Sequence, residues 1–271
     1  MKTDKRREER RLKIVTLLEK YKSLSVDELS DHFEVTGATI RTDLQALAEN
    51  NKVIRTHGKA VIVSERPISP LAERIHSMDR QKKAIGAAAA EMVKEGDIIG
   101  LDASSTAIAL AHALKDRNQL TVVTNCMPVA EEFVNHKQIK VIIPGGKLKH
   151  DSASIVGPGA VEFLSALRLN LAFVGAHSLS LETGLGEGDP DEVEIKRVFL
   201  RIAKTRVLVA DTSKWNRLSL TSFAPWEHIH VFVTDSSISD RDRETLEKQG
   251  TKVTAAAIEK QKDLILGGLK K

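Results

Sequence analysis

Seven short apolar runs from residue 81 onward limit the fold of this chain more than any other feature. They are rich in Val, Ile and Leu, they alternate with segments of helical pattern, and they lie at 97–101, 120–123, 140–143, 171–174, 206–209, 231–234 and 252–254. Strands that are apolar along their whole length are typical of a sheet buried on both faces. Helical segments between them favour parallel pairing, because parallel neighbours need a crossover connection. The pattern therefore predicts an α/β domain with a mainly parallel sheet.

The first 63 residues follow a different pattern. Apolar residues recur at helical spacing over 6–22, and the run Ser25-Val26-Asp27-Glu28 has the form of a capping box that begins a second helix at 26–33. Thr36 is placed to cap a third helix, in which Ile40, Leu44 and Leu47 face inward. Two short helices joined by so tight a turn predict a helix-turn-helix.

Two strand-like runs follow the third helix, at 53–55 and 60–63. Residues 56–59 separate them, and Gly58 tolerates the positive φ that a tight turn requires. We therefore expect a β-hairpin wing beside the helix-turn-helix. The N-terminal domain is predicted to be a winged helix-turn-helix.

These patterns divide the chain into four parts. Residues 1–63 form the winged helix-turn-helix domain, and residues 64–80, which include Pro67 and Pro70 and lack clear apolar periodicity, are expected to be a linker. Residues 81–258 form the larger α/β domain. Residues 259–271 end in Gly and Lys and are expected to be a C-terminal tail.

Composition narrows the class of protein further. No run approaches the roughly 18 to 20 consecutive apolar residues of a membrane span, and the charged N-terminus leads into no signal-peptide core. The single cysteine, Cys126, forms no internal disulfide and is expected to be a small buried residue. We expect a cytoplasmic protein without a metal site or cofactor. Aromatic residues make up only 4% of the chain, which argues against stacking on single-stranded nucleic acid.

The outward face of the third helix has the chemistry of a major-groove reader. Small residues at its start allow close approach, Arg41 can pair with a guanine edge or a phosphate, and threonine methyls can contact thymine. Basic residues of the wing suit phosphates or the minor groove. The candidate DNA-binding residues are Ser25, Thr36, Gly37, Ala38, Thr39, Arg41, Thr42, Arg55, His57 and Lys59. From the pattern alone, a small helical domain whose charges are only solvated is an equal alternative.

Polar residues follow several of the predicted strands. The carboxyl ends of parallel strands meet at one edge of a sheet, where helix N-termini bind anions, so we expect a pocket for a phosphorylated molecule there. The candidate effector-binding residues are Asp102, Ser104, Ser105, Thr106, Thr124, Asn125, Gly145, Gly146, Lys147, Gly175, Glu187, Lys196, Asp211 and Lys214. Taken singly, each hydroxyl-rich turn also fits an ordinary helix cap, and Glu192 with Lys196 also fits a surface pair.

A family resemblance joins the two halves. The runs Val26-Asp27-Glu28-Leu29-Ser30, Ala38-Thr39-Ile40-Arg41-Thr42-Asp43-Leu44 and Ile54-Arg55-Thr56-His57-Gly58-Lys59-Ala60 resemble the winged helix of DeoR-type bacterial transcriptional regulators. The order of motifs after residue 81 resembles the sensor domain of the same family, which is similar in fold to ribose-5-phosphate isomerases. The resemblance implies that Glu187, Glu194, Lys196 and Lys214 belong to an effector pocket, because they match positions of the family's polar pocket. The family's double Arg before the Asp is here Arg41-Thr42, and its Gly-Gly in the wing is Gly58-Lys59.

The resemblance implies a DNA-binding repressor of a carbohydrate-utilisation operon, released by a phosphorylated sugar or sugar-derived effector. Its partners would be double-stranded operator DNA and that effector, and it would act as a homo-oligomer, a dimer or tetramer, with no membrane partner. The alternative is a sugar-phosphate isomerase with an appended DNA-binding domain, but a winged helix has no role in such an enzyme. We therefore expect a regulator and not an enzyme. An architectural DNA-binding protein without a ligand is a third interpretation, which the polar strand ends disfavour.

Overall fold

The computed structural model describes residues 2–21, 23–49, 53–56, 59–62 and 71–258. The chain divides into two compact units, one formed mainly by residues 1–67 and the other by most of the residues from 68 onward. In the described ranges, no helix combines the length and apolar character that a membrane crossing requires. The two units are described separately below.

The N-terminal unit is a winged helix-turn-helix, as predicted. Its helices are α1 (Lys2–Tyr21), α2 (Val26–Phe33) and α3 (Gly37–Glu49). A three-stranded antiparallel sheet has the order β1 (Ser23–Ser25), β3 (Lys59–Ile62), β2 (Val53–Thr56). Its buried core consists of Ile14, Leu18, Val26, Leu29, Ile40, Leu44, Leu47 and Val53. The strand β1 was not expected, because three residues of sequence Ser-Leu-Ser carry no strand signal.

The turn between α2 and α3 is fixed by local hydrogen bonds. The capping box is present: the Glu28 amide donates to Ser25 Oγ at 3.1 Å, and the Ser25 amide donates to Glu28 Oε2 at 2.7 Å. Helix α2 ends at Glu34, which adopts the left-handed conformation with φ 51° and ψ 44°. At the start of α3, the Thr39 amide donates to Thr36 Oγ1 at 3.3 Å. These contacts set the angle at which α3 leaves the turn.

The C-terminal unit is built on a seven-stranded parallel sheet, and all seven predicted strands belong to it. The strands are β4 (Ile98–Leu101), β5 (Leu120–Thr124), β6 (Ile139–Ile142), β9 (Leu169–Val174), β12 (Ala203–Val209), β14 (Val231–Asp235) and β15 (Lys252–Ala256). Their order is β15-β14-β12-β9-β4-β5-β6, and every neighbouring pair is parallel. This confirms the predicted fold class.

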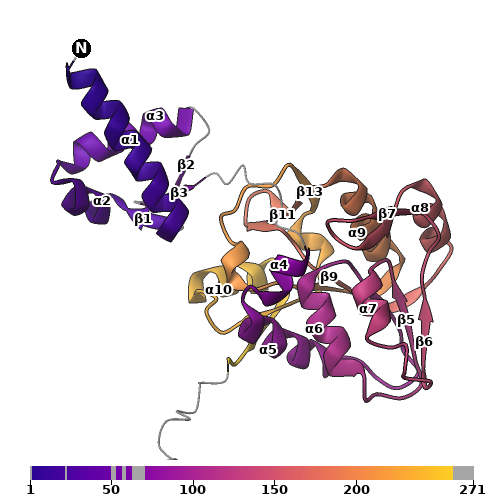
Figure 1. Ribbon diagram of the computed structural model, residues 1–271. Coiled ribbons are helices and arrows are strands. Elements are labelled where there is room, and N and C mark those ends of the chain that lie inside the picture. The colour runs from indigo at the N-terminus through magenta and orange to yellow at the C-terminus, as the bar shows by residue number, and fades with distance from the viewer. Residues whose placement is uncertain (1, 22, 50–52, 57–58, 63–70, 259–271) are drawn as a thin grey trace, which may run out of the picture. The chain divides into compact units, whose positions relative to one another are not determined.

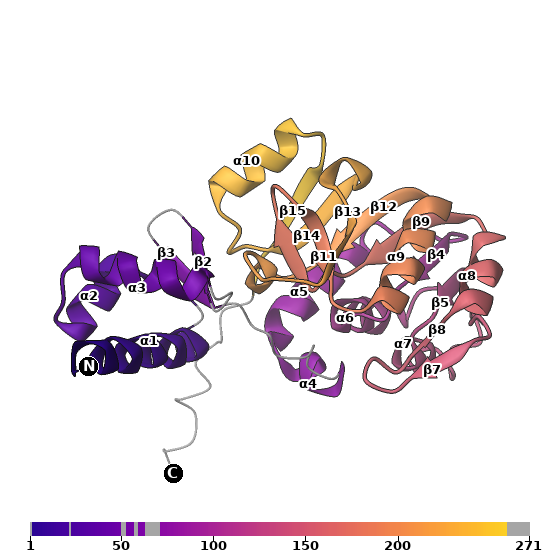
Figure 2. The same cartoon turned by 90° about the horizontal axis from the view of Figure 1, so that it is seen from above.

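Helices cover both faces of this sheet (Figures 1 and 2). One apolar core lies under α5 (Asp79–Ala90), α6 (Ser105–Leu114) and α7 (Met127–Glu131), and the other under α8 (Pro158–Ser165), α9 (Pro190–Ile202) and α10 (Asp240–Lys248). Successive residues of one strand enter opposite cores, as Ala172 and Phe173 do. Burial on both sides explains why the strands are apolar throughout.

Several short elements lack a strong sequence signal and were not predicted. The hairpin of β7 (Lys147–Lys149) and β8 (Ser154–Val156) is one, and the small sheet of β10 (Ser178–Ser180), β11 (Gly184–Glu187) and β13 (Thr221–Ala224) is another. Two single turns of 3-10 helix, η1 (Thr212–Lys214) and η2 (Trp226–His228), complete the unit. Each of the two short sheets contributes a residue to the polar site described below, Ser154 from β8 and Glu187 from β11.

The linker prediction for 64–80 is wrong in its second half. Residues Leu71–His76 form the helix α4, and α5 begins at Asp79. Leu71 is buried, and the buried Lys82 Nζ donates to the carbonyls of Arg74 and Ser77 at the end of α4. Tertiary contacts of this kind leave no periodic signal in so short a segment. Residues 63–70 and the tail 259–271 lie outside the described residues.

We predict that Glu34→Gly stabilises the N-terminal unit by about 0.5–1 kcal/mol, because glycine adopts the left-handed conformation without the steric penalty that glutamate carries there. Hydrogen exchange of the α2 and α3 amides in the full chain measures the gain. Glu34→Ala is the matched control, since it removes the same charge and retains the strain. Equal exchange rates in the two variants would contradict the prediction.

Candidate functional site

The outward face of α3 is exposed and free of carboxylates. Ala38, Arg41, Thr42 and Gln45 are exposed, whereas Ile40, Leu44 and Leu47 are buried. Between Gly37 and Ala48, the only carboxylate is Asp43, which is buried. An exposed helix face with one arginine and small polar residues is suited to approach a DNA groove.

Hydroxyl groups at the start of α3 are partly engaged within the protein. Thr36 Oγ1 and Thr39 Oγ1 lie 3.0 Å apart, and Thr42 Oγ1 donates to the Ala38 carbonyl at 3.0 Å. Ser25 Oγ donates to Glu28 Oε2 at 2.8 Å within the capping box. These contacts keep the hydroxyls at fixed positions, where their oxygens still have lone pairs to accept hydrogen bonds.

Asp43 ties α3 to α1, and sequence reasoning did not select it. Its two oxygens accept from Arg10 Nε at 2.6 Å and from Arg11 Nε at 2.9 Å. Asp43 is 1% exposed, and the two arginine side chains are 20% and 25% exposed. A buried carboxylate shared by two guanidinium groups fixes the rotation of α3 about its axis, and so fixes which residues point outward.

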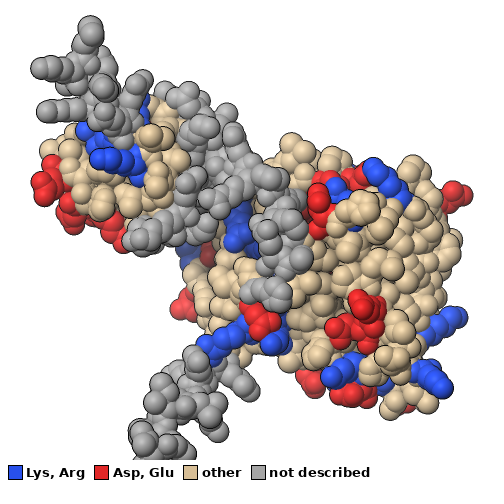
Figure 3. Space-filling view, viewed as in Figure 1, with Lys and Arg blue, Asp and Glu red and all other residues tan. Residues whose placement is uncertain are grey.

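The wing residues are only partly described. Arg55 lies on β2 opposite Ala60, and Lys59 lies on β3 opposite Thr56. His57 lies outside the described residues. Figure 3 shows that, on the face in view, acidic side chains of the N-terminal unit gather over α2, which carries Asp27 and Glu28 in its first turn, while basic ones lie away from it.

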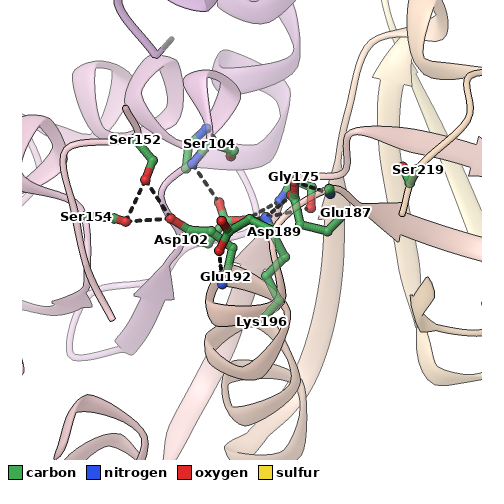
Figure 4. A network of polar contacts seen from close by, with 12 residues as sticks. Asp102, Ser104, Ser152, Ser154, Gly175, Glu187, Asp189, Glu192, Lys196 and Ser219 are labelled. Carbon is green, nitrogen blue, oxygen red and sulfur yellow. Dashed lines mark hydrogen bonds and ion pairs between the residues drawn. The ribbon is translucent and has the colours of Figure 1, made fainter. Parts of the chain in front are cut away.

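Asp102 is the centre of the second site. It follows β4 and is 1% exposed. Its Oδ2 accepts from the Gly175 amide at 2.8 Å and from Lys196 Nζ, and its Oδ1 accepts from the Ser104 amide at 3.2 Å. Asp102 thus joins the end of β4 to the end of β9 and to α9 (Figure 4). Three residues predicted for the pocket, Asp102, Gly175 and Lys196, are in direct contact.

Lys196 is the cation of this group and is 3% exposed. Its Nζ also donates to the Gly175 carbonyl at 3.0 Å and lies 3.4 Å from Glu187 Oε2. Burial alone would lower the pKa of Lys196, but the negative charges of Asp102 and Glu187 outweigh it and hold the pKa above its ordinary value. Lys196 therefore stays charged at neutral pH.

Glu192 belongs to the same group, which excludes the alternative that Glu192 and Lys196 form a surface pair. It is 6% exposed, and its Oε1 accepts from Ser152 Oγ at 2.7 Å and from Ser154 Oγ (Figure 4). Burial raises the pKa of Glu192, against the lowering effects of Ser154, Lys196 and Ser152. The signal was present in the sequence: Glu192 and Lys196 are one helical turn apart, on the face of α9 that also carries apolar side chains.

The N-terminus of α6 adjoins Asp102. Ser104 has extended backbone angles, φ −102° and ψ 149°, and its Oγ accepts from the Ala107 amide at 3.2 Å. Ser104 is therefore unstrained and caps the helix. A Cβ at Gly175 would lie 2.4 Å from the Ser104 Cβ, so glycine is required opposite it. Ser105 and Thr106 are buried, and their amides belong to the first turn, which has no acceptors within the helix.

Two other strand ends carry buried polar atoms without partners. Asn125 Nδ2 donates to the Ile155 carbonyl at 3.2 Å, and Asp211 Oδ1 accepts from the Ser213 amide at 3.0 Å. Among the described residues, Asn125 Oδ1 and Asp211 Oδ2 are buried and have no hydrogen-bond partner. Such atoms are uncommon in folded proteins and favour a bound polar molecule nearby.

Other predicted effector residues have structural roles or lie elsewhere. Thr124 Oγ1 accepts from the Cys126 amide at 3.0 Å, and Gly145 and Gly146 lie between β6 and β7. Lys214 ends the 3-10 turn η1. Cys126 is buried as expected, and burial raises the pKa of its thiol to about 12.

The structure does not bring Glu194 or Lys147 into the polar group. The Glu194 side chain is 57% exposed and pairs with Arg197 at 3.1 Å, because two residues along a helix from Glu192 is the opposite face. The Lys147 side chain is 76% exposed and lies 4.0 Å from Asp191. Both side chains are exposed, so neither belongs to the buried polar group.

Comparison with known proteins gives the family. Residues 10–66 match the DeoR-like helix-turn-helix domain, and residues 77–236 match the DeoR C-terminal sensor domain. The chain belongs to the DeoR family. It is a DNA-binding transcriptional regulator with a sensor domain, and not an enzyme.

Relatives match over most of the chain. The HTH-type transcriptional regulator YulB of Bacillus subtilis is 35% identical over 259 residues, which cover 93% of this chain and 98% of YulB. The glycerol-3-phosphate regulon repressor of Escherichia coli K12 is 30% identical over 223 residues, 82% of this chain and 88% of the repressor. A ribose 5-phosphate isomerase A from Methanocaldococcus jannaschii is 20% identical with a TM-score of 0.38, covering 51% of this chain and 54% of the isomerase. That score is too low to carry an argument.

We predict a pH-dependent difference in stability between this regulator and its Glu192→Gln variant. The pKa of Glu192 is higher in the folded state than in the unfolded state, so folding favours the protonated side chain. The resulting contribution to the free energy of unfolding is complete below the unfolded pKa near 4.5 and is lost as pH rises through the folded pKa. The glutamine stays neutral and can accept from both serines. Urea unfolding should therefore show the variant gaining stability relative to wild type as pH rises above 4.5. A difference that does not vary with pH would contradict the prediction.

Proposed function

We propose that this regulator represses a carbohydrate-utilisation operon and releases its operator when a phosphorylated sugar or sugar-derived molecule binds at the carboxyl edge of the C-terminal sheet. The observation that carries the proposal is the convergence of buried polar groups at that edge: the Asp102–Lys196–Glu187 group, the first turn of α6 and the unpartnered oxygens of Asn125 and Asp211. The name of the Escherichia coli relative supports a phosphorylated effector of this kind.

The charges of the site indicate how such a molecule is oriented. Carboxylates accept hydrogen bonds but donate none, so Asp102, Glu187 and Glu192 are suited to the hydroxyl groups of a sugar and repel a phosphate. The amides and hydroxyls of Ser105 and Thr106 at the helix N-terminus are suited to the phosphate. We therefore assign the phosphate to the start of α6 and the hydroxyl-bearing carbons to the carboxylates.

Effector binding and DNA binding are coupled through the oligomer. Helix-turn-helix proteins place paired recognition helices on two half-sites about one helical turn apart, which requires at least a dimer. We propose a cytoplasmic dimer or tetramer. An effector weakens operator binding if it favours an arrangement in which the two helices cannot both reach their half-sites. The operator then weakens effector binding by the same factor.

Genomic fragments selected by the full-length protein identify the operator, and fluorescence anisotropy of that operator tests the proposal. The probes are glycerol 3-phosphate, ribose 5-phosphate, fructose 1-phosphate, fructose 6-phosphate and glucose 6-phosphate, each beside its unphosphorylated counterpart. We expect one phosphorylated compound to release the operator and its counterpart to have no effect. Tighter operator binding with the effector would overturn the proposed direction of coupling.

Arg41→Ala tests the DNA-binding face. If Arg41 reads a base, the ratio of operator to random-DNA affinity falls about tenfold or more, because a bidentate contact to a base contributes about 1–3 kcal/mol of discrimination. Anisotropy titrations on both DNAs over a range of salt measure this ratio. Lys13→Ala, which removes an exposed cation from α1, is the control. An equal loss of affinity for both DNAs, with a smaller salt dependence of binding than in wild type, would assign Arg41 to a phosphate instead.

Ser105→Ala tests the phosphate position. Loss of one hydrogen bond to a charged group raises the effector concentration for half-release by about tenfold. The affinity for the operator without effector should stay within about twofold of wild type. Ser105 is far in sequence from the DNA-binding unit, and the substitution removes only a hydroxyl group. Ser165→Ala on α8, whose hydroxyl donates to the Val161 carbonyl, is the matched control. An unchanged half-release concentration for Ser105→Ala would exclude this position for the phosphate.

A further inference from the structure

The hairpin β7–β8 is fastened to the N-terminal end of α9 at two points. Lys149 Nζ on β7 lies 2.7 Å from Asp189 Oδ2, and Asp189 caps α9 by accepting from the Glu192 amide at 3.2 Å. Ser152 and Ser154 both donate to Glu192 Oε1, and their own oxygens are 2.8 Å apart. The position of the loop between the two strands therefore depends on the carboxylate of Glu192.

The same loop holds the first turn of α4. The Leu71 amide donates to the Asp151 carbonyl at 2.7 Å. Asp151 and Ser152 are consecutive residues, so the α4 contact and the Glu192 contact are made by neighbouring positions of the loop. Leu71 is 3% exposed and belongs to the core under α5 and α6.

Helix α4 is too short to be stable without such contacts. It has six residues, and isolated helices of that length do not form in water. Its N-terminal amide is satisfied by Asp151, and at its other end Lys82 Nζ, which is buried, donates to the carbonyls of Arg74 and Ser77. Removing either contact leaves buried backbone groups unpaired and favours an unwound segment. The wound state of α4 therefore depends on the contacts at its two ends.

We propose that the β7–β8 hairpin transmits occupancy of the polar site to α4, with Ser152 and Ser154 as the positioning residues. The proposal rests on the proposed function, since it concerns how that site acts. A ligand hydroxyl that donates to Glu192 Oε1 competes with the two serine hydroxyls for that oxygen. When the serines release it, the loop moves and Asp151 no longer caps α4.

Unwinding α4 changes the connection to the DNA-binding unit. Among the described residues, α4 is the first helix after β3, the last strand of the wing, and α5 follows it after two residues. When α4 is wound, the connection between β3 and the anchored part of the C-terminal unit ends at Leu71. When α4 is unwound, that connection lengthens by six residues and its reach increases. Two DNA-binding units on longer connections lose the fixed spacing that two half-sites require.

The physical link can be tested without any effector. In the full-length Ser152→Ala/Ser154→Ala double variant, hydrogen exchange of the amides of residues 71–76 should be about tenfold faster than in wild type, because α4 loses its positioned cap. Exchange in β4, β9 and β12 should be unchanged. Ser178→Ala is the matched control, since it removes another serine-bonded hydroxyl, the one 2.5 Å from Ser219 in the small sheet. Unchanged exchange in α4, or equal acceleration in the central strands, would overturn the proposal.

The coupling is tested with whichever of the five phosphorylated compounds releases the wild-type protein from its operator. The ratio of operator Kd with and without that compound should fall toward one in Ser152→Ala/Ser154→Ala and in Lys82→Met, which weakens the opposite end of α4. Combining the changes should add no further loss, because both act on one element. A full release ratio in either variant would overturn the inference while leaving the proposed function intact. Absence of release of the wild-type protein by every sugar phosphate would instead overturn the proposed function.

Discussion

The buried ion pair between Asp102 and Lys196 is the interaction on which the C-terminal unit depends. It joins three elements that are remote in sequence: the end of β4, the end of β9 through both backbone groups of Gly175, and the inner face of α9. Removing two charges from water is costly, and the cost is offset only when each charge keeps several hydrogen bonds. Asp102 and Lys196 meet that condition with each other, with Gly175 and, for Asp102, with the Ser104 amide. The same contacts place Ser104, Glu187 and Glu192 around one point.

The N-terminal unit uses a buried carboxylate in a related way. Asp43 accepts from two arginines of α1 and thereby orients α3, whereas the apolar core alone would tolerate small rotations of that helix. In both units the apolar core sets the architecture, and one buried carboxylate fixes the side chains that we propose to meet a ligand. This arrangement separates the residues that hold the fold from those that face DNA or an effector.

The parts predictable from sequence are those with a repeating physical signal. Seven strands buried on both faces are apolar throughout, and the capping box of Ser25 and Glu28 is local, so both could be placed before any coordinates. Contacts between distant segments have no such signal. The burial of Glu192 depends on a hairpin 38 residues earlier in the chain, and α4 depends on Asp151 and Lys82. Glu194 matches a position of the family's polar pocket, although helical geometry turns it outward here.

The charge of the polar group constrains what any effector must be. Three carboxylates, Asp102, Glu187 and Glu192, surround one ammonium group, and that ammonium is already paired within the protein. An anion placed there would meet uncompensated negative charge, whereas a group with several hydroxyl donors would satisfy acceptors that water satisfies otherwise. A phosphate alone therefore lacks the groups that engage Glu192, and a free sugar lacks the anion for the first turn of α6. In the proposed site, a molecule that carries both would occupy the two ends at once, with its hydroxyl end at Glu192, the carboxylate that holds the β7–β8 hairpin.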